Sequence, residues 1–495
     1  MNASLALIQV PALAGVACLF IAPDKARRAL LVGAALFHAA AAVYLWSAPA
    51  ARGGASAYFG FDEVGLYFLS VTSALFLAVA VYAAQFLAHE SSDALQSGDS
   101  GPLFLNQPER FFTAFLLFFL AAMTAVAASR HLGLLWIAVE TTTLVSAPLI
   151  YFHRRPSALE AMWKYLLICS VGIALALLGV FSFATAATQA AGGEGALTLD
   201  GLIGMAPMMD RNWLIMAFVF LFVGYGTKMG LAPFHMWLPE AHGESPPAVS
   251  ALLSGALLNC AFLGILRAYQ VLLAAGLGPF AQKILLVFGL FSMFAAAVFI
   301  VRQTDYKRLL AFSSVEHMGI MAFGVGVGGA GVFGAAFHAA AHSLVKAALF
   351  MTAGNILARF ATKECGAVRG AIRDLPASGL LWVGGFLAIT GAPPFATFLS
   401  EFTILKAALD QGHPWAAALY MLLLAIIFMG MIQVALNMAY GAPSVPGALR
   451  ITSEPPLSYL PPLILLMGAL ILGVWPPVAV TEAIGRVAGA LGGGL

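Results

Sequence analysis

The chain is dominated by long apolar runs, which recur from one end of the sequence to the other. Hydrophobic residues make up 61% of its 495 residues and charged residues only 9%, whereas soluble globular proteins carry about a quarter charged residues. An α-helix needs about 20 apolar residues to cross the hydrocarbon core of a membrane. The sequence therefore predicts an all-α polytopic membrane protein, and its net charge of +2 gives no case for a nucleic-acid partner.

Fourteen runs of this kind can be marked, and each is expected to form one membrane-spanning helix. The first run lacks the positively charged start of a signal peptide, so we expect it to remain as a helix. The amphipathic stretch after Trp475 is expected to fold back on the fourteenth helix. The expected spans cover about 4–22, 28–47, 64–87, 111–128, 132–151, 160–185, 213–238, 247–271, 281–301, 308–327, 331–358, 379–409, 415–440 and 458–475.

The connecting segments carry their positive charges unevenly. With the N-terminus placed outside, fourteen Lys and Arg residues fall in inside loops and six in outside loops. Cytoplasmic loops carry an excess of Lys and Arg, so the sequence predicts a bacterial cytoplasmic membrane protein with a periplasmic N-terminus. The inside residues are Lys25, Arg27, Arg28, Arg110, Arg154, Arg155, Arg302, Lys307, Arg308, Arg359, Lys363, Arg369, Arg373 and Arg450.

Two expected helices are interrupted by similar glycine- and proline-containing segments, 230–234 and 391–395. Proline removes a backbone donor and frees carbonyls, which are tolerated at membrane depth only where they face protein or water. Paired broken helices in two halves of a transporter indicate internal repeats with a site at each break. A simple proline kink is the alternative for either segment alone.

Ionisable residues lie inside the apolar runs near the first break. Glu140 has no sequence neighbour with which to pair, and Lys228 is its natural partner from another helix. Lys164, near Glu160, is a weaker candidate because a lysine near a helix end can extend to the interface. A structural ion pair is the alternative to a functional role.

The run 331–358 has the densest ionisable pattern. His338, His342 and Lys346 recur every four residues, which places them about 6 Å apart on one helix face. Three exchangeable groups on one stripe indicate a water-linked proton relay, which Glu401 and Lys406 would extend. A solvated pair of Lys406 with Asp410 is the alternative for that lysine.

No redox or hydrolytic centre is visible in the sequence, so we expect no cofactor and no metal. Cys18, Cys169, Cys260 and Cys365 are scattered and resemble small core residues. The string Gly324-x-Gly326-x-x-Gly329 follows an expected membrane helix rather than a strand, which argues against a dinucleotide site. The sequence leaves open whether the chain is part of an enzyme.

Several motifs resemble the proton-pumping, antiporter-like subunits of the complex I superfamily. The segments are 228–242 (KMGLAPFHMWLPEAH), 245–250 (SPPAVS) and 305–314 (DYKRLLAFSS), together with the run that carries His338. Within about 110–410, the segments 163–170 (WKYLLICS) and 314–319 (SVEHMG) are most similar to the F-type membrane subunit of hydrogenase-4 and formate hydrogenlyase complexes.

The resemblance implies fourteen helices with two inverted five-helix repeats. Helices 4–8 would occupy 111–271 and helices 9–13 would occupy 280–440, flanked by 1–110 and by 441–495. The implied proton path comprises Glu140, Lys164, Lys228, His338, His342, Lys346 and Glu401, with His235, His317 and Lys406 as further candidates. Asn259 stands where many members have lysine, so an unbroken lysine relay is not expected.

The same resemblance implies a subunit of a redox-driven oxidoreductase complex, such as a group 4 hydrogenase. Its partners would be other membrane subunits and, indirectly, soluble redox or zinc-bearing subunits. A subunit of a cation/proton antiporter, the proton-flux subunit of an inorganic-carbon uptake complex and a structural anchor remain alternatives.

Overall fold

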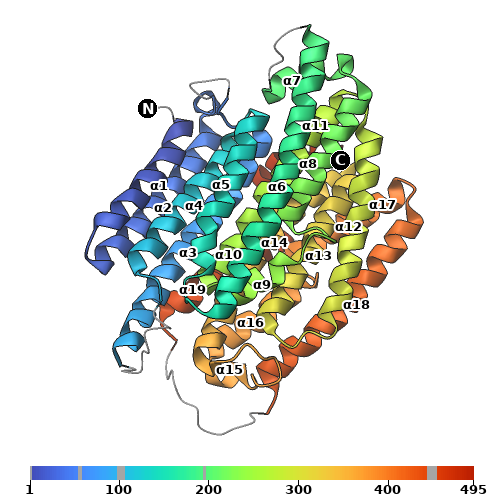
Figure 1. The fold of residues 1–495 in the computed structure, drawn as a ribbon. Coiled ribbons are helices and arrows are strands. Elements are labelled where there is room, and N and C mark those ends of the chain that lie inside the picture. The colour runs from blue at the N-terminus through green and yellow to red at the C-terminus, as the bar shows by residue number, and fades with distance from the viewer. Residues whose placement is uncertain (1–2, 54–57, 97–105, 193–196, 443–453, 495) are drawn as a thin grey trace.

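The computed structural model describes residues 3–53, 58–96, 106–192, 197–442 and 454–494. Within these ranges the chain is a bundle of roughly parallel, tilted helices, with α1 and α2 at one edge and α17 and α18 at the opposite edge (Figure 1). The predicted all-α membrane architecture is thereby confirmed. Arg450, one of the residues counted for the orientation, lies outside the described residues.

The helices begin and end close to the expected boundaries. The N-terminal group and the first broken region are α1 (Ala3–Phe20), α2 (Asp24–Ser47), α3 (Glu63–Gln96), α4 (Glu109–Ala128), α5 (Leu132–Ile150), α6 (Pro156–Ala191), α7 (Leu199–Met205), α8 (Arg211–Met229), α9 (Trp237–Glu244), α10 (Pro247–Leu252) and α11 (Leu258–Ala274). The remaining helices are α12 (Gly278–Ile300), α13 (Tyr306–Val327), α14 (Ala330–Phe360), α15 (Ala371–Asp374), α16 (Pro376–Ile389), α17 (Ala396–Asp410), α18 (Pro414–Tyr440), α19 (Pro456–Val474) and α20 (Val478–Ala490).

Three expected spans are divided rather than continuous. Among the described residues, twelve helices are long and apolar enough to cross a membrane. The spans expected at 213–238 and 379–409 each become two shorter helices, and a π-helical turn (η3, Leu253–Leu257) interrupts the span at 247–271. Hydropathy alone indicates the length of an apolar run and not its backbone hydrogen-bond pattern, so it does not predict the π-helical turn.

The two helix breaks have the same local geometry. Gly230 ends α8 with φ +81°, and a cis peptide bond follows between Ala232 and Pro233. Gly391 has φ +70°, and the bond between Pro393 and Pro394 is also cis. Both glycines occupy the left-handed region, which side chains with a Cβ disfavour. The sequence prediction of two similar breaks is therefore confirmed at the level of the backbone.

The π-helical turn η3 brings polar groups into the centre of the bundle. The carbonyl oxygen of Gly255 accepts hydrogen bonds from Asn259 Nδ2 (3.0 Å) and from Ser343 Oγ (2.7 Å). Asn259 Nδ2 also donates to Ser343 Oγ at 2.8 Å. These bonds join α11 to α14, so Asn259 and Ser343 form a polar contact between the two halves of the chain.

The C-terminal helix lies elsewhere than expected. α20 packs on α3 and α14 rather than mainly on α19. Arg486 in α20 donates to Glu63 Oε2 at 3.0 Å. The side-chain amide nitrogen of Gln270, Nε2, donates to the carbonyl oxygen of Ala490 at 3.3 Å. These long-range partners hold the amphipathic tail, and no local sequence pattern specifies them.

A buried ion pair ties α11 to the start of α3. Arg267 is almost completely buried and donates to both carboxylate oxygens of Asp62, at 2.5 and 2.6 Å. Burial alone would raise the pKa of Asp62, but the Arg267 guanidinium outweighs it and the pKa is lowered. The pair therefore fixes the N-terminal helices against the broken region.

Replacing Gly230 with alanine should destabilise the fold. The left-handed backbone costs an L-residue about 1–2 kcal/mol, and a Cβ at this position would collide with Leu238 Cδ1. We expect a lower thermal midpoint of the detergent-solubilised protein for Gly230→Ala. Gly33→Ala is the control, because a Cβ there meets nothing within 4 Å, and its midpoint should be unchanged or raised; equal midpoints for both variants would contradict the role of Gly230.

Candidate functional site

The first polar cluster surrounds Lys228 at the end of α8, just before the break. The fully buried ammonium donates to Thr143 Oγ1 at 2.8 Å and to the Tyr165 hydroxyl at 2.5 Å. It also lies 4.4 Å from the centre of the Tyr165 ring. Two hydroxyls and an aromatic face thus compensate the loss of water around the charge.

Glu140 is linked to Lys228 through a hydroxyl, which corrects the expectation of a direct pair. Thr143 Oγ1 donates to Glu140 Oε2 at 3.2 Å, and Ser170 Oγ donates to Glu140 Oε1 at 2.9 Å. The ammonium, the Thr143 hydroxyl and the carboxylate therefore form a directed chain of donors. The carboxylate is half-buried, and Thr143 occupies the space between the two charges.

Lys164 lies outside this chain of hydrogen bonds. Its side chain is 42% exposed and forms ion pairs with Glu160 at 2.7 Å and with Glu240 at 2.8 Å. Glu240 belongs to α9, so the lysine joins α6 to the helix that follows the break. The structure places Lys164 at the rim of the first cluster rather than in its interior.

The second cluster is a directed hydrogen-bond chain of two histidines and a serine. Ser400 Oγ donates its one proton to the carbonyl oxygen of Thr397 at 2.8 Å, so it must accept from His338 Nδ1 at 2.9 Å. His338 Nε2 is then the acceptor for His317 Nδ1, 2.8 Å away. In this arrangement both rings carry their proton on Nδ1, and His317 Nε2 is buried without a hydrogen-bond partner among the described residues.

Carboxylates flank the histidine chain on two sides. Glu316 Oε2 lies 3.9 Å from His317 Nε2 and accepts from Ser313 Oγ at 3.3 Å. Glu401 Oε1 is buried without a hydrogen-bond partner among the described residues. One ligand-type atom from each of His317, His338 and Glu401 lies within 4.8 Å of the other two. No metal-ligand spacing is visible in the sequence, because the three residues come from α13, α14 and α17.

Lys346 is the cation nearest to this second cluster. It is fully buried, and its ammonium donates to the carbonyl oxygen of Leu310 at 2.7 Å. It lies within electrostatic reach of Glu316 and of His342. The ring nitrogens of His342 make no hydrogen bond to any described residue, although its ring centre lies 5.0 Å from that of His317.

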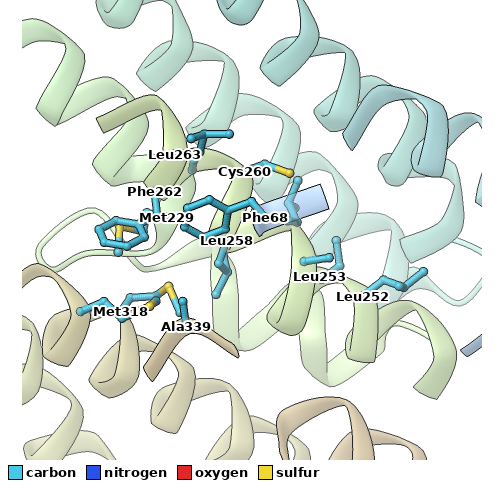
Figure 2. Close-up of a cluster of buried hydrophobic side chains, with 14 of the residues drawn as sticks. Phe68, Met229, Leu252, Leu253, Leu258, Cys260, Phe262, Leu263, Met318 and Ala339 are labelled. Carbon is cyan, nitrogen blue, oxygen red and sulfur yellow. The ribbon is translucent and has the colours of Figure 1, made fainter. Parts of the chain in front are cut away.

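Apolar side chains lie beside the polar residues of both clusters, and the group that contains Met229, Leu258, Met318 and Ala339 is called the apolar layer here. Figure 2 shows Met229, Leu258, Met318 and Ala339 gathered in one hydrophobic group, each next in sequence to a polar residue of the site. Among the described residues, no hydrogen bond joins the Lys228 cluster to the histidine chain. Asn259, next in sequence to Leu258 of this layer, donates to Ser343, and its Oδ1 is a buried acceptor without a partner in the described structure.

Two further candidates lie away from both clusters. His235 packs its ring against Phe299 and Phe312, with ring centres 5.9 and 6.2 Å away. Lys406 is 68% exposed and pairs with Asp410 at 2.6 Å, as the solvated-pair alternative predicted. His235 is buried in the segment between α8 and α9, and its ring nitrogens have no hydrogen-bond partner among the described residues. Lys406 lies near the exposed end of α17, so neither side chain joins the hydrogen bonds of the two clusters.

Part of the 305–314 motif has a structural role. Lys307 was counted as an inside-loop charge, yet its side chain is buried and its ammonium donates to the carbonyl oxygens of Ser245 (2.6 Å) and Gly243 (3.3 Å). These carbonyls lie at the C-terminal end of α9, where a cation is favoured. Lys363 reaches the same end through Glu244 Oε1 at 2.7 Å.

Thr143, Tyr165, Glu316 and Ser400 are among the cluster residues that sequence analysis missed. Glu316 had a usable signal, since it is a carboxylate inside an apolar run and directly precedes His317. The three hydroxyl residues have no distinguishing pattern. Only the packing of α5, α6 and α8, and of α14 with α17, brings them to the charged groups.

Broken helices with buried, hydrogen-bonded ionisable groups define a polytopic membrane protein of the ion-transport type. The family model of the transmembrane region of NADH:quinone oxidoreductase and Mrp antiporters ("NADH:quinone oxidoreductase/Mrp antiporter, TM") matches residues 129–427. The chain belongs to this family. It is an antiporter-like membrane subunit of the complex I superfamily.

Full-length relatives agree with this assignment. The chain is 35% identical over 431 residues to the hydrogenase-4 component F homolog of Methylacidiphilum infernorum, covering 86% of this chain and 87% of that protein. It is 30% identical to F(420)H(2) dehydrogenase subunit N of Methanosarcina mazei, covering 74% and 75%. A chain of the membrane-bound sulfane sulfur reductase, an archaeal respiratory membrane complex, has the same fold, with a TM-score of 0.84, 18% identity and coverage of 100% and 98%.

Removing the Tyr165 hydroxyl should destabilise the first cluster. Tyr165→Phe leaves the buried ammonium with one hydrogen-bond acceptor fewer, and an unsatisfied buried group costs about 1–3 kcal/mol. We expect a lower thermal midpoint of the solubilised protein. Tyr225→Phe is the matched control, because the Tyr225 hydroxyl is also buried but has no partner among the described residues; an equal loss in both variants would contradict the contact with Lys228.

Proposed function

We propose that this chain carries protons across the membrane through its two buried clusters. The observation that carries the proposal is the directed chain from His317 through His338 to Ser400, flanked by the carboxyl groups of Glu316 and Glu401. Proton transfer along such a chain needs only short movements between neighbouring oxygen and nitrogen atoms. Ionisable groups held inside membrane helices mark ion pathways in transport proteins.

The first cluster would control the charge that enters the path. Lys228 and Glu140 interact through the Thr143 hydroxyl, so a change in charge at Glu140 alters the energy of the Lys228 ammonium without direct contact. The half-buried position of Glu140 leaves it open to a neighbouring subunit. A partner that shifts charge there would move a proton from Lys228 toward the second cluster.

Transfer between the clusters needs water in the apolar layer. Asn259 can order water but cannot hold a proton charge at neutral pH, and its free Oδ1 offers one acceptor for such a water. We assign the storage of charge in the second half to Lys346 and Glu316. Hydration of the layer around Met229 and Met318 would then act as the gate between the halves.

We further propose that the chain works in a redox-driven complex of the bacterial cytoplasmic membrane, with its N-terminus in the periplasm. The names of the two relatives, a hydrogenase-4 component homolog and an F(420)H(2) dehydrogenase subunit, favour redox partners. Soluble redox subunits would act on this chain through other membrane subunits. Helices α4–α11 and α12–α18 would be the two repeats, each with one broken helix.

Replacing Lys228 with methionine should abolish proton translocation while the complex remains assembled. We expect proton uptake by proteoliposomes containing the intact complex to fall by at least about tenfold, which corresponds to about 1.4 kcal/mol or more. Glu140→Gln should behave in the same way. Lys406→Met is the control, because its exposed side chain lies outside the path, and it should retain uptake within about twofold.

Two outcomes would contradict this assignment. Unchanged proton uptake in Lys228→Met and Glu140→Gln would remove both residues from the path. Proton movement that requires a sodium gradient and persists without redox turnover would instead favour the cation/proton-antiporter alternative. Size-exclusion analysis of each variant complex shows whether assembly is retained.

The orientation can be tested by labelling single cysteines. In a variant with its four cysteines replaced by alanine, Tyr58→Cys should react with a membrane-impermeant maleimide added to intact spheroplasts, because the predicted topology places residue 58 on the periplasmic side. Arg154→Cys should react only after the membrane is opened. The reverse pattern would invert the proposed topology.

A further inference from the structure

The two hydrogen-bonded histidines are arranged like a pair of metal ligands, with a proton at the place where a metal ion would lie. His317 Nδ1 and His338 Nε2 face each other at 2.8 Å. Nitrogen ligands of a tetrahedral zinc ion lie about 3.3 Å apart, given Zn–N bonds of about 2.0–2.1 Å. A separation of the rings by about 0.5 Å would therefore admit the ion. We propose that His317, His338 and Glu401 form a binding site for a divalent transition-metal cation, best matched by Zn²⁺.

One ring has an acceptor for its outer nitrogen, and a carboxylate lies near the other. His338 Nδ1 donates to Ser400 Oγ at 2.9 Å. When His317 Nδ1 binds the ion, its proton moves to Nε2; Glu316 Oε2 lies 3.9 Å from that nitrogen and becomes its acceptor when the two move closer together. Metal-binding histidines almost always donate their other ring N–H to a carboxylate, carbonyl or similar acceptor. The site therefore includes outer partners for both imidazoles.

The charges around the site also match a divalent cation. Glu316 and Glu401 supply two negative charges when both are ionised, and Glu401 Oε1 is free of hydrogen bonds within the described structure. Two buried carboxylates near each other are costly without positive charge. A Zn²⁺ ion coordinated by Glu401, with Glu316 behind His317, balances the charges of the two carboxylates, and the Lys346 ammonium near Glu316 adds one positive charge to the surroundings.

A pocket borders the Glu401 side of the site. Its volume is about 250 Å³, and Thr390, Gly391 and Tyr420 line it together with apolar side chains, whereas neither histidine does. Its volume accommodates several water molecules, whose share of liquid volume is about 30 Å³ each. Three protein ligands and a water are the usual set of a zinc site with an open position.

The ligand types favour zinc over the hard cations. Mg²⁺ and Ca²⁺ bind through oxygen atoms, whereas two imidazoles and one carboxylate suit Zn²⁺ and related transition metals. An ion at this position would take up the two nitrogens that form the proposed proton chain. Zinc binding and proton passage along His317 and His338 would therefore exclude each other.

Metal binding can be measured on the full-length chain in liposomes, purified without a histidine tag and stripped with a chelator. We expect one Zn²⁺ per chain, with nitrogen and oxygen but no sulfur ligands by X-ray absorption spectroscopy. Co²⁺ should give the visible spectrum of a tetrahedral site. Ser400→Ala should weaken binding by about 10–100-fold, and Glu401→Gln by at least as much.

His242→Ala is the matched control. His242 is also fully buried and its ring nitrogens lack partners among the described residues, but it stacks on Phe350 away from the three ligands. It should bind zinc as the unaltered chain does. Equal zinc affinity in the unaltered chain and in Glu401→Gln, sulfur ligation, or no zinc bound by the unaltered chain would each overturn the site. These readouts do not depend on proton flux, so they decide the site separately from the transport proposal.

Discussion

A charged group inside a membrane helix must find polar partners within the protein, and this requirement organises the whole molecule. Lys228 is held by two hydroxyls from α5 and α6, and Lys346 by a backbone carbonyl of α13. Each contact crosses between helices, because no group on the same turn can replace the lost water. The positions of the charges therefore determine which helices must pack together, and the apolar surfaces fill the remaining space.

The two clusters solve this requirement in different ways. In the first, an ammonium and a carboxylate are kept apart by the Thr143 hydroxyl, so they influence each other while each keeps its own hydrogen bonds. In the second, the hydrogen bonds run in one direction, from His317 to His338 and from His338 to Ser400. No hydrogen bond between described residues joins the two clusters, and apolar side chains that include Met229 and Met318 pack in one group beside them.

The sequence predicts the helices well because apolar run length is a local property. Helices occupy all the expected spans within the described residues, and the glycine and proline residues located both breaks. The partner of Glu140, the position of α20 and the meeting of His317, His338 and Glu401 depend on contacts between distant segments. The π-helical turn at Leu253–Leu257 was missed because its residues fit an ordinary apolar helix. Glu316 is the exception, since the sequence contained its signal.

The one-way arrangement of the histidine chain has a kinetic consequence. After a proton has entered at His317 Nε2 and hopped through both rings to Ser400, each ring holds its N–H on the opposite nitrogen, and a second hop in the same direction is blocked. The proton that Ser400 holds toward the Thr397 carbonyl can leave only after the hydroxyl turns away from that carbonyl. Before the next hop, the side chains must rotate, or the ring protons must return to the nitrogens that held them at the start. The His317 and His338 rings are stacked, with centres 5.0 Å apart and an interplanar angle of 28°, which restrains such rotation. Reorientation of these rings, rather than the hop itself, would then set the interval between successive protons.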